Sequence, residues 1–139
     1  MNELIEKIKK ARFVWVCGNG GSASTAEHFV TDLVKKGYPA ICLNSNTSVI
    51  TMIANDYGYD EIFSKQLEAY ATEDDLLITI SCSGTSANIV KAKDWMKNLV
   101  HDPVCLEEVY SFEVFGKETD YGLLEDKHLK FAHKVAKKL

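Results

Sequence analysis

The sequence predicts an α/β fold, a three-layer α/β/α sandwich built on a mostly parallel sheet with flavodoxin-like or Rossmann-like topology. Short apolar runs rich in strand-forming residues alternate with segments of helical periodicity along the chain. Two of these runs pass directly into turns of small residues, and each turn is followed by another helical segment. Alternation of this kind implies right-handed crossovers and helices on both faces of the sheet.

The first half of the chain predicts helix, strand, helix and strand. Leu4, Ile5 and Ile8 recur at helical spacing, and residues 13–17 favour a strand. After a glycine-rich turn, a helix is predicted to end near Gly37, and the sequence YPAICLN is typical of a second strand. The apolar face of the helix after that turn consists of Ala26, Phe29, Val30, Leu33 and Val34.

The second half continues the alternation. Residues 47–71 predict two helices joined by a turn at 55–58, and residues 74–81 predict the most apolar strand. A small-residue turn and a helix follow over 82–99, one or two strands are expected within 100–119, and the chain ends in a helix. The side chains expected to face inward are Ile62, Phe63, Leu67 and Tyr70, then Leu124, Leu129, Ala132, Val135 and Ala136.

Length and charge narrow the class of protein. With 139 residues the chain predicts one domain, 1–139, and its formal net charge of −4 disfavours nucleic-acid or anionic-membrane partners. The N-terminus lacks the apolar core of a signal peptide and a membrane-spanning run, so a cytoplasmic location is expected.

Four widely spaced cysteines predict reduced, mostly buried thiols: Cys17, Cys42, Cys82 and Cys105.

The two small-residue turns predict a ligand site. In an open parallel sheet, ligands bind where strand ends and helix N-termini meet. The turn at 18–22 is glycine-rich, and the turn at 81–86 carries three serines and a threonine. Hydroxyl donors and free backbone N–H groups at a helix N-terminus suit a phosphate, so the second turn is the better candidate. A serine-rich helix cap without a ligand is the alternative.

Nucleotide-binding motifs fit less well. Gly18, Gly20 and Ala23 have the spacing of a dinucleotide fingerprint, but the second predicted strand ends in CLNSNT, without the acidic residue that would bind a ribose hydroxyl. Neither turn ends in the Gly-Lys-Ser/Thr sequence of a P-loop. A dehydrogenase is therefore disfavoured.

Two histidine and carboxylate pairs could share a metal ion. His28 and Asp32 are four residues apart on one helix, and Glu125 and His133 are eight apart on another, so each pair shares a helix face. Nitrogen and oxygen ligands suit zinc, and the same groups could supply the acid and base of a proton transfer. Spacing alone also allows two unrelated solvated faces.

The segments CGNGGSASTAEHF, NTSVITMIANDYGYDEIFSKQLEA and LLITISCSGTSANIVKA resemble the sugar isomerase (SIS) domain family, and within it the phosphoheptose isomerases. The resemblance resumes at TDYGLLEDKHLKFAH. It implies an SIS-type fold and a phosphosugar aldose–ketose isomerase acting on sedoheptulose 7-phosphate. A homo-oligomer, a dimer or tetramer, is also implied.

The resemblance further implies roles for individual residues. His28 and His133 match zinc-ligand histidines of the family, and His133 is also an acid/base candidate. Asp32 and Glu125 complete the expected zinc ligands, and either could be the base that takes a proton from carbon. The implied substrate contacts are Asn19, Gly20, Ser22, Asp56, Ser81, Cys82, Ser83, Thr85 and Ser86.

Several positions depart from the family pattern. Asp32 stands where phosphoheptose isomerases generally have glutamate, and Glu125 stands where they often have glutamine. The N-terminal segment is short, and a fourth strand with a Thr-Gly-rich turn is not found between Ala92 and Asp120.

The alternative function is a non-catalytic SIS module that binds a phosphosugar or a protein, like the bacterial SIS protein that associates with the replication initiator DnaA.

Overall fold

The computed structural model describes residues 1–99 and 120–139, and the strands expected within 100–119 lie outside these ranges. Each helix and strand predicted in the described ranges is present. The elements are α1 (Asn2–Lys10), β1 (Val14–Gly18), α2 (Gly21–Lys35), β2 (Ala40–Cys42), α3 (Thr47–Asp56), η1 (Tyr59–Glu61), α4 (Ser64–Tyr70), β3 (Leu76–Ile80), α5 (Ala87–Leu99) and α7 (Tyr121–Lys138).

The strands of the described residues form a parallel three-stranded sheet in the order β2-β1-β3. Val14 pairs with Ala40 on one side and with Leu76 on the other, which fixes the register. Every residue of β1 is buried, as expected for a central strand covered on both faces. Because β1 has neighbours on both sides, its carboxyl end lies at the point where the order of strands reverses.

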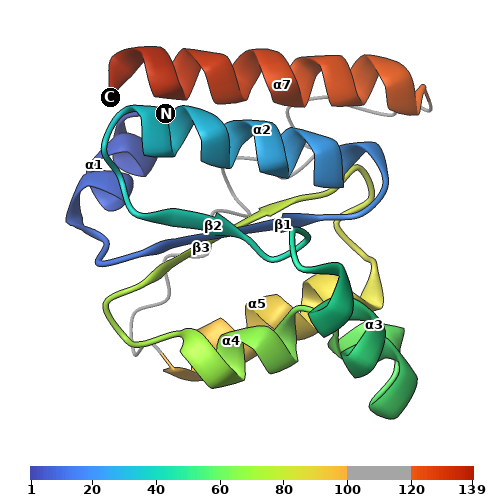
Figure 1. The fold of residues 1–139 in the computed structure, drawn as a ribbon. Helices are drawn as coiled ribbons and strands as arrows, with labels where there is room; N and C mark the ends of the chain where they lie inside the picture. The colour runs from blue at the N-terminus through green and yellow to red at the C-terminus, as the bar shows by residue number, and fades with distance from the viewer. Residues whose placement is uncertain (100–119) are drawn as a thin grey trace.

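Helices cover both faces of the sheet, so the predicted three-layer α/β fold is confirmed. In Figure 1, α1, α2 and α7 lie on one face, and α3, α4 and α5 lie on the other. Each face has its own hydrophobic core: Phe29 and Leu33 of α2 pack with Val16 on one, and Phe63 and Leu67 pack with Leu77 on the other. The sheet therefore sits between two cores, and its carboxyl edge is where the turns collect.

The structure corrects three local expectations. The second strand covers Ala40–Cys42 and not all of 38–44, because Ser45 turns back and donates to the Cys42 carbonyl from both its N–H and its hydroxyl. Tyr70 was expected to face inward but is half exposed, with its ring stacked on Trp15. On α7, His128 is buried whereas Leu129 is only partly buried.

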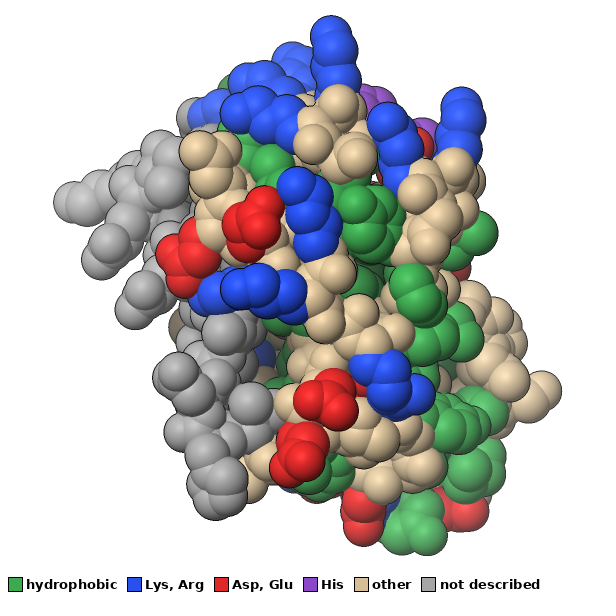
Figure 2. Space-filling model, turned by 90° about the vertical axis from the view of Figure 1, so that its left-hand side faces the viewer, with side chains coloured by type: hydrophobic (Ala, Val, Ile, Leu, Met, Phe, Trp, Pro, Cys, Tyr) green, Lys and Arg blue, Asp and Glu red, His purple; other side chains and the backbone are tan. Residues whose placement is uncertain are grey.

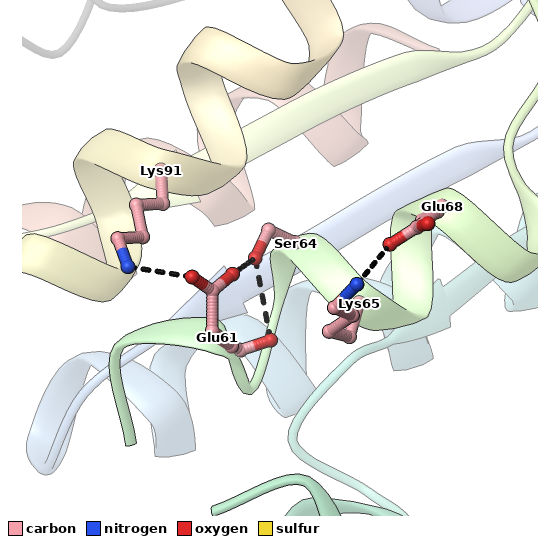
Figure 3. A network of polar contacts seen from close by, with 5 residues as sticks. All are labelled: Glu61, Ser64, Lys65, Glu68 and Lys91. Carbon is pink, nitrogen blue, oxygen red and sulfur yellow. Dashed lines mark hydrogen bonds and ion pairs between the residues drawn. The ribbon is translucent and has the colours of Figure 1, made fainter. Parts of the chain in front are cut away.

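A polar network fastens α5 to the segment before α4 (Figure 3). Lys91 of α5 donates to Glu61 at 2.5 Å, and Glu61 also accepts from the Ser64 hydroxyl at 2.6 Å. Hydrogen bonds from Lys91 and then Ser64 hold the pKa of Glu61 below its ordinary value. The network ties α5, the helix that follows the serine-rich turn, to η1 and α4 on the same face of the sheet.

Basic side chains gather at the C-terminal ends of three helices. Figure 2 shows lysine and arginine side chains across the upper part of the face on which α1 and the ends of α2 and α7 lie. Helices α1, α2 and α7 each carry lysines in their last turn, where a positive charge favours the helix dipole. Among the described residues, no helix has the length and apolar character to cross a membrane.

Candidate active site at the carboxyl edge of the sheet

The first turn leaves the end of β1 and opens α2. Gly18 is tied to Asn44, whose amide donates to the Gly18 carbonyl at 2.8 Å and accepts from its N–H at 3.1 Å. A Cβ at Gly18 would lie 2.6 Å from the Ser22 carbonyl oxygen and 2.8 Å from that of Ile80, so a side chain does not fit. Gly20 has φ 56°, a conformation that glycine adopts readily. The sequence pattern of glycines thus reflects both close packing and backbone conformation.

The second turn leaves β3 and opens α5. Gly84 has φ 67°, and its N–H donates to the Ser81 hydroxyl oxygen at 3.0 Å. The Thr85 N–H donates to the Ser83 hydroxyl oxygen at 3.3 Å. Because both hydroxyls act as acceptors within the turn, their own O–H groups are available to donate to an anion.

The two turns share a pocket of about 290 Å³. This pocket lies between the carboxyl ends of β1 and β3, where open α/β sheets bind ligands. Most of the predicted substrate contacts line it, whereas Thr85 and Asp56 are exposed and do not. The lining residues are Asn19, Gly20, Gly21, Ser22, Ser81, Cys82, Ser83, Ser86, Tyr121 and Glu125.

Glu125 reaches this pocket from α7. Its carboxylate sits against Gly21, where a Cβ would lie 2.0 Å from Oε1. Because Gly21 is the first residue of α2, the Glu125 carboxylate stands at the positive end of the helix dipole. The helix itself has no acidic residue in its first turn and no side-chain cap. Glu125 also shares the pocket with the serine-rich turn.

The structure brings His28, Asp32 and His133 together on the adjoining faces of α2 and α7. The two histidine Nε2 atoms are 2.8 Å apart, and Asp32 Oδ2 lies 3.9 Å from each of them. One ligand atom from each residue falls within 4.8 Å of the others, and Glu125 is not part of this cluster. The predicted pairing of His28 and Asp32 with His133 is thus present, while Glu125 lies with the pocket.

The donor set fits a zinc ion. Two ligand atoms bound to one tetrahedral zinc at 2.0–2.1 Å lie about 3.3 Å apart. The three ligand atoms of the cluster lie between 2.8 and 3.9 Å from one another, a range that brackets this spacing. Two imidazoles and one carboxylate are also a common set for a catalytic zinc with an open position. About half of each histidine side chain is exposed, so a ligand has access to the cluster.

Burial distinguishes the cysteines. Cys17 and Cys42 are buried free thiols, as predicted, and burial raises the pKa of Cys42 to about 11. Cys82 is only partly buried and lines the pocket, 3.9 Å from the Ser22 hydroxyl. Burial raises its pKa as well, so its thiol stays protonated at neutral pH. Cys105 lies outside the described residues.

Motif spacing in the sequence did not indicate several residues that contact or line the site. Asn44 and Asn88 bond the first turn from two different elements, and the Tyr59 hydroxyl lies 3.4 Å from Asn19 Oδ1. Tyr121, an exposed residue, adds an aromatic side chain to the lining of the pocket. The only local signal is that Asn44 and Asn88 stand just after a strand and just inside a helix.

The fold and the site together define an α/β protein in which two small-residue turns line a pocket at the carboxyl edge of a parallel sheet. The family described as SIS domain matches residues 2–101, and the chain belongs to this family. The predicted resemblance is confirmed.

Relatives and solved structures agree with this membership. The chain is 49% identical over 101 residues to a phosphoheptose isomerase of Helicobacter pylori (strain HPAG1), an alignment that covers 68% of this chain and 53% of the relative. It is 34% identical to the phosphoheptose isomerase of Aliarcobacter butzleri (strain RM4018), covering 94% and 77% of the two chains. The alignment thus spans about half the length of the Helicobacter pylori relative.

Among solved structures, phosphoheptose isomerase GmhA from Neisseria gonorrhoeae superposes with a TM-score of 0.78 at 26% identity, covering 98% of this chain and 80% of that one. A phosphoheptose isomerase from Francisella tularensis gives a TM-score of 0.79, also at 26% identity, with 98% and 82% covered.

Proposed function

We propose that this protein is a phosphosugar isomerase that interconverts an aldose and a ketose, with sedoheptulose 7-phosphate as the substrate to test first. The observations that carry the proposal are the pocket that Glu125 shares with the serine-rich turn and the His28–Asp32–His133 cluster, which stands further along the same two helices, α2 and α7. The similarity to relatives named phosphoheptose isomerase supports the same reaction. We also propose that residues 1–139 act as one SIS domain.

The phosphate is proposed to bind at Ser81, Ser83 and Ser86. Their hydroxyls and the backbone N–H groups at the start of α5 would hold the anion, and the helix dipole would favour its charge. Binding energy from this remote group would orient the reacting carbons. Sugar hydroxyls would then lie near Gly20 and Ser22, beside the first turn.

The reaction moves a proton between adjacent carbons through an enediol, so it needs a base at carbon and an acid at oxygen. Asp32 or Glu125 is proposed to take the proton from carbon, and His133 to move protons to and from the substrate oxygens. His28, Asp32 and His133 would hold a zinc ion, which would supply Lewis-acid polarisation of the sugar oxygens. Glu125 as a fourth zinc ligand stays a prediction.

Two variants test the proposed chemistry. Asp32→Ala and His133→Ala should each lower the turnover of sedoheptulose 7-phosphate by about 100-fold or more, because general acid–base groups contribute factors of that size. Glu27→Ala and Lys134→Ala are matched controls, since both residues are exposed on the same two helices. Near wild-type turnover in both test variants would show that the acid–base assignment is wrong, whereas near wild-type turnover in Asp32→Ala alone would assign the base to Glu125.

A pocket variant separates enzyme from binding module. Ser83→Ala should weaken binding of the phosphosugar, whereas Ser48→Ala on the exposed part of α3 should not. Binding of the phosphosugar without any conversion by the wild-type protein would favour the non-catalytic SIS module.

A further inference from the structure

A buried asparagine joins the two turns of the pocket. Asn88, only 2% exposed, exchanges two hydrogen bonds with Asn19. The Asn19 amide donates to Asn88 Oδ1 at 2.9 Å, and the Asn88 amide donates to Asn19 Oδ1 at 2.8 Å. Asn88 Oδ1 also accepts from the Ile89 N–H at 2.9 Å, which fixes the orientation of its side chain.

These bonds cross between separate elements. Asn19 is the first residue after β1, and Asn88 lies in the first turn of α5, immediately beyond the serine-rich turn. The contact therefore bridges 69 positions of sequence and sets one ligand-binding turn against the other. On the opposite side, Asn44 fixes the backbone of Gly18. The carboxyl end of β1 is therefore bonded on one side by a residue that follows β2 and on the other by a residue that follows β3.

The same bonds restrain Asn19, the side chain that the resemblance assigns to the sugar. Asn19 Oδ1 accepts from Asn88 and lies 3.4 Å from the Tyr59 hydroxyl, while its amide nitrogen donates to Asn88. Leaving a buried amide without a partner is costly, so Asn88 does not release Asn19 readily. Asn19 thus holds the turn through one N–H and its Oδ1, while the second N–H of its amide can still donate to a ligand in the pocket.

We propose that Asn88 is a positioning residue that acts through Asn19 to align the glycine-rich turn with the serine-rich turn. A substrate held by its phosphate at the second turn meets reacting groups beyond the first turn, so the alignment of the turns sets where the carbons lie. The effect on catalysis rests on the proposed function, while the alignment itself does not. The affinity for inorganic phosphate alone depends mainly on the second turn.

A double-mutant cycle tests the proposal. The set is Asn88→Ala, Asn19→Ala and the double variant, with Asn88→Asp as a conservative variant that still accepts from Asn19 but cannot donate to it. Asn46→Ala is the control, because it removes an amide that caps α3 through the Val49 N–H without touching the pocket. The measurements are kcat, KM, the Kd for inorganic phosphate and the hydrogen exchange of amides 20–24.

The single variants should lower kcat by about 10- to 100-fold, the size of effect expected from small misplacement of reacting groups. The Kd for phosphate should change little, and the double variant should be no worse than either single one. Asn88→Asp should lower kcat as well, because its second carboxylate oxygen would face the Asn19 Oδ1 acceptor in place of the donor. Effects on kcat that multiply in the double variant, or a kcat equal to wild type, would overturn the proposal, as would equal losses in Asn46→Ala.

Hydrogen exchange keeps this inference separate from the proposed function. Amides 20–24 should exchange faster in Asn88→Ala and Asn19→Ala, and equally fast in the double variant, whether or not the protein isomerises a sugar. If the wild type is inactive but this pattern is seen, the proposed function fails and the alignment by Asn88 stands. Unchanged exchange of these amides in both single variants would overturn the inference.

Discussion

Gly18 shows at the level of one residue why the first turn needs glycine. Its φ is not in the left-handed region, so conformational freedom is not the reason. The reason is space, because the backbone carbonyls of Ser22 and Ile80 approach from two different elements. The sequence predicts a glycine-rich turn here, but only the packing shows which glycine is required by crowding.

Gly18→Ala should therefore destabilise the fold. Neither carbonyl can move without shifting α2 or β3, and overpacking of this kind costs about 1–3 kcal/mol. The measurement is the free energy of unfolding in urea. Gly122→Ala is the control, since it adds a methyl group to the first turn of α7 with only the Asp120 carboxylate nearby, at 3.3 Å. Equal stability of Gly18→Ala and wild type would contradict the packing argument.

The His28–Asp32–His133 cluster is the other feature that depends on single residues. Zinc should bind with about one ion per chain, and His28→Ala and His133→Ala should each weaken it by about 10-fold or more, because each removes a direct ligand. Equilibrium dialysis with metal analysis measures this. His128→Leu is the matched control, since that histidine is buried and outside the cluster. Zinc binding equal to wild type in both test variants would rule the site out.

Helices α2 and α7 show what periodicity predicts and what it does not. Figure 1 shows the two helices side by side on one face of the sheet. Sequence spacing places His28 and Asp32 on one face of a helix and His133 on a second helix. The contact between His28 and His133 depends on how the two helices pack. Helical spacing also placed Glu125 with His133, whereas the two residues face different parts of the site: the pocket and the cluster.

The burial of His128 on α7 predicts a dependence of stability on pH. Burial lowers its pKa below the ordinary value of 6.5. Between that value and the lower pKa of the folded state, the unfolded chain binds a proton that the folded chain does not. The contribution of His128 to the free energy of unfolding is therefore fully present above pH 6.5. It falls as the pH drops below 6.5, by about 1.4 kcal/mol in total for each unit by which the pKa is lowered.

Urea unfolding at pH 7.5 and 5.5 measures this loss. His128→Leu should show a smaller loss between the two pH values than the wild type, because the group that titrates is gone. The pKa of Glu61 is lowered from 4.5, so its carboxyl group does not titrate between pH 7.5 and 5.5. An unchanged pH dependence in His128→Leu would contradict the assignment.

At the scale of the whole molecule, the order β2-β1-β3 determines where the site lies. The alternation of strands and helices predicts a parallel sheet and the edge at which the turns collect. Alternation does not determine which strand is central, because that depends on pairing between distant segments such as Val14 with Ala40 and Leu76. The contacts of Asn88 with Asn19 and of Asn44 with Gly18 are long-range in the same sense, so local patterns carry no sign of them.

The measurement that tests the central proposal most directly is NMR of sedoheptulose 7-phosphate incubated with the zinc-supplemented protein in D₂O. A proton transfer through an enediol, with a side chain as base, predicts an aldose 7-phosphate that carries solvent deuterium at C2, and its loss in His133→Ala. Absence of any aldose product from the wild-type protein would contradict the proposed isomerase.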